Sequence, residues 1–173
     1  MTRKIFFLLL ILISGFAAAC SGSREGGDTA NPGAAAKPAE LVDIAYGAGI
    51  YDLEKSAEGS WRWVSEKGAI RLKNSKADMK LKVAGSCPVD LLGGDTEISL
   101  ILNGEVLEKV KLTKEKNGLD KEFTIPAAKQ TGDASELSIE STRFFIPKQV
   151  YKNSTDDRKL SFSLTKLEWT PAK

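Results

Sequence analysis

Hydrophobic and polar residues alternate with a period of two over most of the chain that follows residue 40. Met79, Leu81 and Val83, for example, are separated by lysines. Successive side chains of a β-strand point to opposite faces, so this pattern predicts a half-buried strand with its lysines outward. Related strand patterns occur at residues 69–73, 98–102, 122–125, 137–139 and 160–164.

Turn-forming residues separate these segments, for example Gly93-Gly94-Asp95 and Asn117-Gly118. No long segment has the 3.6-residue period of a helix, and no internal repeat is visible. Short strands bounded by turns are typical of all-β folds. We therefore expect an antiparallel two-sheet sandwich, jelly-roll-like, over residues 41–173.

An Asn-Gly pair at residues 103–104 predicts a β-hairpin, because a type I′ turn needs positive φ at both central residues. A strict two-residue turn would place Leu100 opposite Leu107 but Ile98 opposite Lys109, so the apolar faces do not match. We expect a β-bulge or a longer loop in this hairpin.

The first residues have the layout of a secretory signal. Arg3 and Lys4 precede an apolar run over residues 5–13, and three alanines stand directly before Cys20. The apolar run is shorter than the ~20 residues that span a bilayer. Small residues before a cysteine resemble the lipobox of bacterial lipoproteins. This resemblance implies a signal peptide over residues 1–19, cleavage before Cys20, and lipid on Cys20. The alternative is a plain secretory signal with a chance cysteine.

Residues 20–40 form a segment that is rich in Gly, Ala, Ser and Pro and that has no large apolar side chain. Such a composition predicts a flexible linker between the lipid and the folded domain. In the lipoprotein family, Ser21 after the cysteine favours passage to the outer membrane of cells that have one. We therefore expect a protein of the cell envelope, anchored by lipid outside the cytoplasmic membrane.

The composition excludes several kinds of active site. The chain contains no histidine, which rules out Ser-His and Cys-His nucleophile pairs and histidine-ligated zinc. With Cys20 lipidated, Cys87 has no disulfide partner and is expected to be a small buried residue. The mature chain has a balanced charge, which argues against nucleic acid as a partner. We expect no catalytic residues, no metal and no cofactor; a pair of carboxylates for glycan cleavage is the open alternative.

Three short motifs recur in the same order in a known family. They are Gly49-Ile50-Tyr51-Asp52-Leu53-Glu54, Trp61-Arg62-Trp63-Val64 and Asp156-Asp157-Arg158-Lys159-Leu160. Together they resemble the β-sandwich domain that accompanies many bacterial membrane glycosyltransferases and sugar-polymer proteins. Two features differ from that family: Ser161 stands where a glycine is usual, and we expect this domain to stand alone on a lipid anchor rather than to be fused to a transferase.

Two groups of candidate site residues follow. Trp61 and Trp63 lie on the same face of a strand and, with Tyr51, are candidate glycan-binding residues, because sugar rings stack on aromatic faces; the alternative is that they fill the core.

A charged corner is predicted from Arg158 paired with Glu54. The role expected of this corner is structural; binding of sugar hydroxyls or calcium is the alternative. Its predicted members are Glu54, Arg62, Asp156, Asp157 and Arg158.

These observations predict a non-catalytic, lipid-anchored β-sandwich that binds or organises cell-envelope glycan, with the membrane as a partner through Cys20. The alternative is a structural lipoprotein that docks onto an envelope protein complex.

Overall fold

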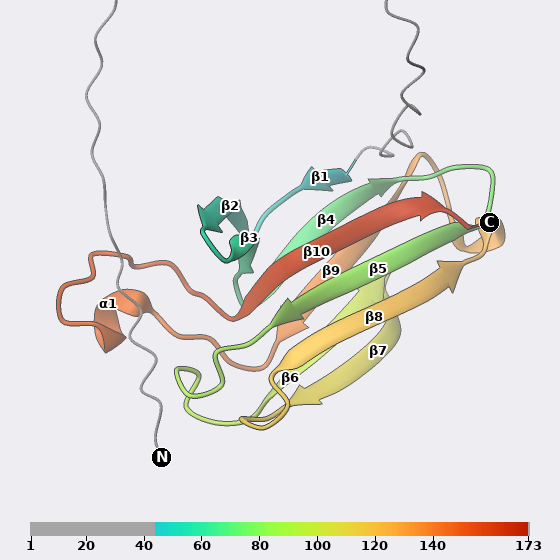
Figure 1. The fold of residues 1–173 in the computed structure, drawn as a ribbon. Coiled ribbons are helices and arrows are strands. Elements are labelled where there is room, and N and C mark those ends of the chain that lie inside the picture. The colour runs from blue at the N-terminus through green and yellow to red at the C-terminus, as the bar shows by residue number, and fades with distance from the viewer. Residues whose placement is uncertain (1–43, 173) are drawn as a thin grey trace, which may run out of the picture. The chain divides into compact units, whose positions relative to one another are not determined.

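The computed structural model describes residues 44–172, which form a sandwich of two five-stranded sheets with every strand pair antiparallel (Figure 1). One sheet has the order β1 (Ile44–Tyr46), β4 (Lys67–Lys73), β9 (Ala134–Ser141), β6 (Thr96–Leu102) and β7 (Glu105–Leu112). The other has the order β2 (Ile50–Ser56), β3 (Gly59–Val64), β10 (Phe162–Pro171), β5 (Met79–Ser86) and β8 (Gly118–Ile125). The predicted all-β, jelly-roll-like sandwich is therefore confirmed.

The predicted signal peptide, Cys20 and the linker up to residue 40 lie outside the described residues. No helix within residues 44–172 is long and apolar enough to cross a membrane. The helical elements of this region are η1 (Ala127–Lys129) and α1 (Pro147–Val150), which are each a single turn.

The alternating side chains of the strands meet between the sheets and form the core. Met79, Leu81 and Val83 of β5 are fully buried, as the sequence pattern predicts, while the lysines between them face outward. Trp169 of β10 is the largest fully buried side chain, and its indole nitrogen donates a hydrogen bond of 2.7 Å to the carbonyl oxygen of Lys73. Cys87 is also fully buried, and burial raises the pKa of its thiol to about 12, so it is not a reactive nucleophile.

The hairpin of β6 and β7 contains the expected β-bulge. Asn103 and Gly104 have φ values of 51° and 83°, as a type I′ turn requires. The register shifts between Leu100 and Ile101, and this places Ile98 opposite Val110 instead of Lys109. The extra residue restores the apolar face that a strict two-residue turn would have broken.

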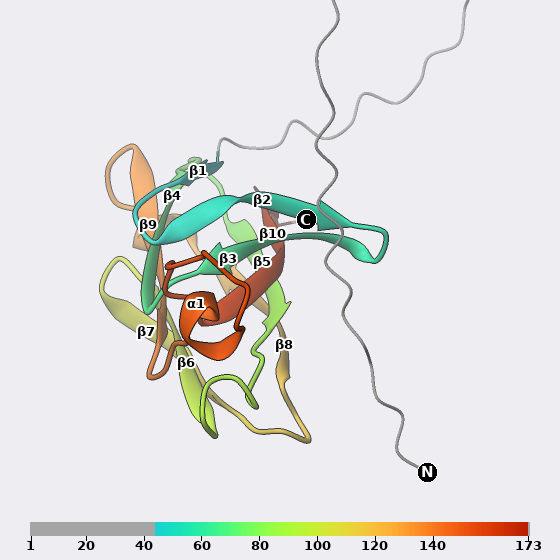
Figure 2. The same ribbon diagram turned by 90° about the vertical axis from the view of Figure 1, so that its left-hand side faces the viewer.

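Two segments depart from the regular sandwich and lie against each other. The turn end of the β2–β3 hairpin projects beyond the other strands (Figure 2). The register between β2 and β3 shifts between Ile50 and Leu53. The 20 residues between β9 and β10, here called the arch (residues 142–161), carry α1 and contact β3 where Phe145 meets Trp63. Connections of this length are uncommon in compact domains and frequently carry function.

Candidate functional site

The outer face of the β2–β3 hairpin brings the predicted aromatic residues together. Trp61 and Trp63 lie on this face of β3, because Val64, the next residue along the strand, points into the core and side chains alternate between the two faces. Glu54 of β2 is the direct cross-strand partner of Trp61. The side chain of Tyr51, near the bulge of β2, lies under the guanidinium of Arg158 from the arch. The site therefore has two walls, the hairpin and the arch.

Trp63 is part of the packing that holds the arch on the hairpin. Its ring meets Phe145 of the arch edge to face, with centroids 6.0 Å apart and an angle of 81° between the ring planes. It also packs against the main core. The face of Tyr51 is likewise engaged, since the guanidinium carbon of Arg158 lies 5.1 Å from its ring centroid. These contacts favour a structural role for Trp63 and Tyr51, which is the alternative to glycan binding.

Trp61 is different, because its indole N–H has no hydrogen-bond acceptor. Its Nε1 is shielded from solvent, and it is the one such side-chain nitrogen or oxygen without a partner within residues 44–172. The side chain as a whole is only half-buried. A buried donor without an acceptor costs about 1–3 kcal/mol. A group that supplied an acceptor to the Trp61 nitrogen would therefore stabilise the protein.

A three-membered ion cluster fixes the arch beside Trp61. Arg158 Nη1 lies 2.9 Å from Glu54 Oε1, and its Nε and Nη2 donate to the carboxylate of Asp156 at 2.7–3.1 Å. All three side chains are about one third exposed. Hydrogen bonding to Arg158 lowers the pKa of Asp156 despite partial burial. The predicted pair between Arg158 and Glu54 is thus present, and it joins the arch to β2.

Two other members of the predicted charged corner lie outside this cluster. Arg62 points to the inner side of the hairpin, where its guanidinium lies 4.2 Å from the ring centroid of Tyr46 and donates to the Tyr51 carbonyl oxygen at 3.0 Å. Its direction follows from strand alternation, since Trp61 and Trp63 on either side point outward. Asp157 is exposed and makes no ion pair with any described residue.

Ser161 ends the arch at the position where the resembling family has glycine. It is fully buried, and its hydroxyl lies 2.6 Å from the carbonyl oxygen of Ser65 and 2.9 Å from that of Val64. Its backbone N–H donates to the same Val64 carbonyl at 2.9 Å. The serine therefore ties the arch to the end of β3, with both its hydroxyl and its backbone N–H hydrogen-bonded.

The sequence analysis did not single out Tyr46, Val150 or Tyr151, which are 40%, 46% and 51% exposed. Val150 and Tyr151 are adjacent on the arch and follow Pro147, which begins α1 and is buried. A signal for them exists in the sequence: two apolar residues stand between polar ones in a segment without strand alternation.

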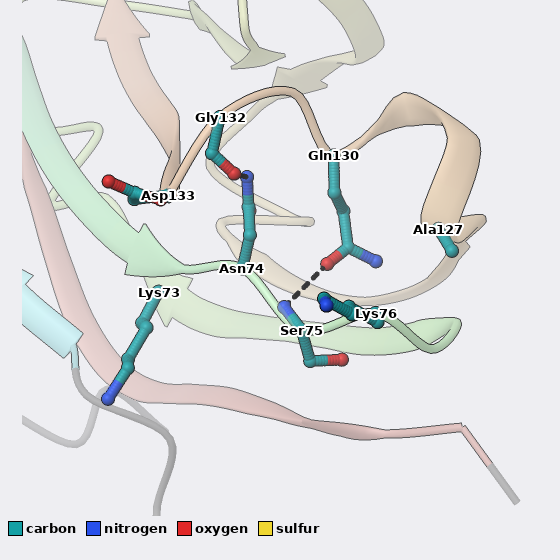
Figure 3. Close-up of a pocket in the computed structure, with 8 residues that line it drawn as sticks. All are labelled: Lys73, Asn74, Ser75, Lys76, Ala127, Gln130, Gly132 and Asp133. Carbon is teal, nitrogen blue, oxygen red and sulfur yellow. Dashed lines mark hydrogen bonds between the residues drawn. The ribbon is translucent and has the colours of Figure 1, made fainter.

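A separate open pocket of about 410 Å³ lies at the end of the sandwich where β4 meets the turn before β9 (Figure 3). Its polar groups bond to one another: Ser75 N donates to Gln130 Oε1 at 3.0 Å, and Asn74 Nδ2 donates to the Gly132 carbonyl oxygen at 3.2 Å. No aromatic side chain lines it. This pocket therefore lacks the aromatic face and the unsatisfied donor that distinguish the Trp61 region.

No group of three or more His, Cys, Asp or Glu side chains within residues 44–172 is arranged to hold a metal ion. Both oxygens of the Asp156 carboxylate, one of the groups in the calcium alternative, accept hydrogen bonds from Arg158.

Replacing Arg158 with alanine is expected to lower the free energy of unfolding by about 1–2 kcal/mol, between the values for exposed and buried ion pairs, because the cluster is partly exposed. The effect should shrink at low pH. Because the pKa of Asp156 is lowered in the folded state, its contribution is present above the unfolded pKa of about 3.9 and is lost as pH falls through the lower folded value.

Urea unfolding measured between about pH 6 and pH 2.5 checks this prediction. Asp156→Asn should reproduce part of the loss at the higher pH, whereas Asp157→Asn, at the neighbouring unpaired carboxylate, should leave stability unchanged. An equal effect of the two substitutions would contradict a specific role for the cluster.

Comparisons with known proteins give no family. No family model matches the chain, and no curated protein matches it. Among solved structures, it is similar to a GH115 4-O-methyl-alpha-glucuronidase, BtGH115A, with 11% identity over 86% of this chain and a TM-score of 0.44, although the chain spans only 20% of that protein. It is also similar to the EclA C-terminal domain, described as a sugar-binding protein (15% identity, 81% of this chain, 89% of that one, TM-score 0.40). A family 35 carbohydrate binding module from Clostridium thermocellum matches at 10% identity over 75% of this chain and 99% of that module, with a TM-score of 0.40. Because these TM-scores are below 0.5, the proposals below rest on the geometry of this chain.

Proposed function

We propose that this protein is a non-catalytic, lipid-anchored β-sandwich that binds cell-envelope glycan through the Trp61 face of the β2–β3 hairpin. The observation that carries the proposal is the state of Trp61: a half-buried indole whose N–H has no acceptor, directly across the strand pair from the Glu54 carboxylate.

This combination suits a sugar. An indole offers a flat apolar face to the C–H groups of a sugar ring, and the shielded N–H of Trp61 would reach a hydroxyl oxygen once the side chain turns outward on binding. Glu54 can accept a hydrogen bond from a second hydroxyl, since only one of its oxygens is engaged by Arg158. Arg158 holds the Glu54 carboxylate in place before a ligand binds, which reduces the entropy lost on binding.

The anchor in this proposal is lipid on Cys20, which would keep the domain at the outer surface of a membrane. Glycan of the envelope would then lie within reach of the site.

Calorimetric titration against peptidoglycan sacculi and extracted surface polysaccharides tests the binding. Trp61→Ala should weaken the affinity by at least about tenfold, or about 1.4 kcal/mol. Trp63→Phe is the matched control, because it keeps an aromatic ring against Phe145 and should leave affinity unchanged. A folded protein that binds no member of the panel, or Trp61→Ala with unchanged affinity, would contradict the proposal.

A structural lipoprotein that docks onto an envelope protein complex is the second candidate. One observation favours it: Tyr46 and Leu53 are 40% and 47% exposed, and Arg62, which stacks on Tyr46, is the cross-strand partner of Leu53. Crosslinking of the lipidated protein in its own membrane separates the candidates, since docking predicts a defined protein adduct that Leu53→Ser removes and Trp61→Ala retains.

A further inference from the structure

Charge is distributed unevenly between the arch and the rest of the described domain. Residues 142–161 contain five basic and two acidic residues, a net charge of +3. The remaining described residues contain 15 basic and 17 acidic residues, a net charge of −2. Within residues 44–172, the arch is thus the one long connection with a strong excess of positive charge, and its Arg158 pairs with Glu54 of the proposed glycan site.

The positive charge at the tip of the arch is not used within the fold. Lys148 and Lys152 form no ion pair with any acid within residues 44–172. Lysines on the sheets, in contrast, are largely paired across strands, as Lys67 is with Glu140 and Lys80 with Glu122. Of the two acids in the arch, Asp156 is neutralised by Arg158 and only Asp157 is unpaired.

An exposed aromatic ring lies between these lysines in the sequence. Tyr151 is 51% exposed, and its neighbour Val150 is 46% exposed. The backbone that carries them is fixed by hydrogen bonds: Tyr151 N donates to the Pro147 carbonyl at 2.8 Å, Lys148 N to that of Asp156 at 2.8 Å, and Ser154 N to that of Tyr151 at 3.0 Å. The tip therefore presents one aromatic ring and two unpaired cations on an ordered backbone.

We propose that the tip of the arch, residues 147–153, gives the site a preference for acidic glycans, with Lys148 and Lys152 pairing with carboxylate or sulfate groups and Tyr151 contacting a sugar ring. This inference rests on the proposed function. Charge-assisted hydrogen bonds from lysine to such anions are stronger than those to neutral hydroxyls. An anionic membrane surface is a weaker match, because two apolar side chains and a four-residue helix lack the long apolar face of an interfacial anchor.

The test uses polymers that differ only in charge: polygalacturonate against its methyl ester, and dextran sulfate against dextran. The full-length protein in neutral detergent should bind the charged member of a pair at least about tenfold more tightly at low salt, and this preference should diminish between about 50 and 300 mM NaCl. The double variant Lys148→Gln/Lys152→Gln should lose the preference and keep the affinity for the uncharged polymer. Tyr151→Ala should weaken binding of both members of a pair.

The matched control is Lys76→Gln/Lys116→Gln, which removes the same charge from two exposed lysines that lack ion pairs within the described chain and lie outside the arch. If both double variants lost the preference for the charged polymers equally, the preference would depend on overall charge, and this result would overturn the inference. Tight binding of uncharged polymers without any preference would overturn it and leave the proposed function standing. No binding to any of the four polymers would overturn the inference, and the proposed function would then be decided by the titration with sacculi and extracted polysaccharides. The same double variant of the arch is also tested for binding to anionic and neutral vesicles. If it lost only a preference for anionic vesicles and bound the polymers normally, the partner would be the membrane and the inference would be overturned.

Discussion

Replacing Gly49 with alanine should destabilise the domain by at least about 3 kcal/mol, from about 1–2 kcal/mol for the left-handed backbone and a further cost for the steric conflict. Gly49 has a φ of +74° in the turn that leads into β2. A Cβ at this position would lie 1.9 Å from the Lys67 carbonyl oxygen and 2.6 Å from Ser65 Oγ. The first of these atoms belongs to the backbone of β4, which cannot move without disturbing the sheet. Equilibrium unfolding in urea measures the loss.

Gly93→Ala separates the two contributions. Gly93 has the same φ of +74°, but the nearest atom to an added Cβ is Arg143 Nη1 at 3.9 Å. This variant should lose only the backbone part, about 1–2 kcal/mol. Equal losses at Gly49 and Gly93 would show that close packing against β4 does not explain the glycine that opens the first motif.

Replacing Cys20 with alanine should abolish membrane association of the mature chain, which is the largest effect expected of any single change. Two or more acyl chains give stable anchoring, and the Cys20 thiol is the group to which the first of them would be attached. Fractionation of cells into membrane and soluble pools measures the outcome, with mass spectrometry of the N-terminal peptide as a direct readout of lipid.

The control for this prediction is Cys87→Ala, because that cysteine is fully buried in the core and should leave the distribution unchanged. A mature Cys20→Ala chain that remains in the membrane fraction would show that something other than lipid holds the protein there.

The strand pattern was sufficient to predict the sandwich, because alternation along each strand decides which side chains face the core. It also predicted the bulge in the β6–β7 hairpin, since Ile98 opposite Lys109 would have broken an apolar face. The pairing of Arg158 with Glu54 followed from bringing together motifs at the two ends of the domain.

Local sequence could not distinguish Trp61 from Trp63. The two residues share a strand, a face and nearly the same neighbours, and they differ only in what the arch places over them: Phe145 meets Trp63, whereas the Trp61 nitrogen has no partner. Their difference arises from packing between segments about 80 residues apart. The exposure of Tyr151 was missed for the same reason, because the course of the arch is determined by Ser161, Arg158 and Phe145 rather than by a pattern in the arch itself.

The central claim is that glycan binds at Trp61, and the indole N–H resonances test it most directly. The chain has three tryptophans, so its ¹H–¹⁵N spectrum contains three indole signals, each assignable by a single Trp→Phe substitution. On titration with a glycan identified in the panel, the Trp61 signal should shift strongly, because the sugar ring packs on the indole and its N–H, turned outward on binding, gains an acceptor. The Trp169 signal should stay in place, because its N–H is bonded to the Lys73 carbonyl in the core. A glycan that binds while the Trp61 indole signal remains unmoved would contradict the account.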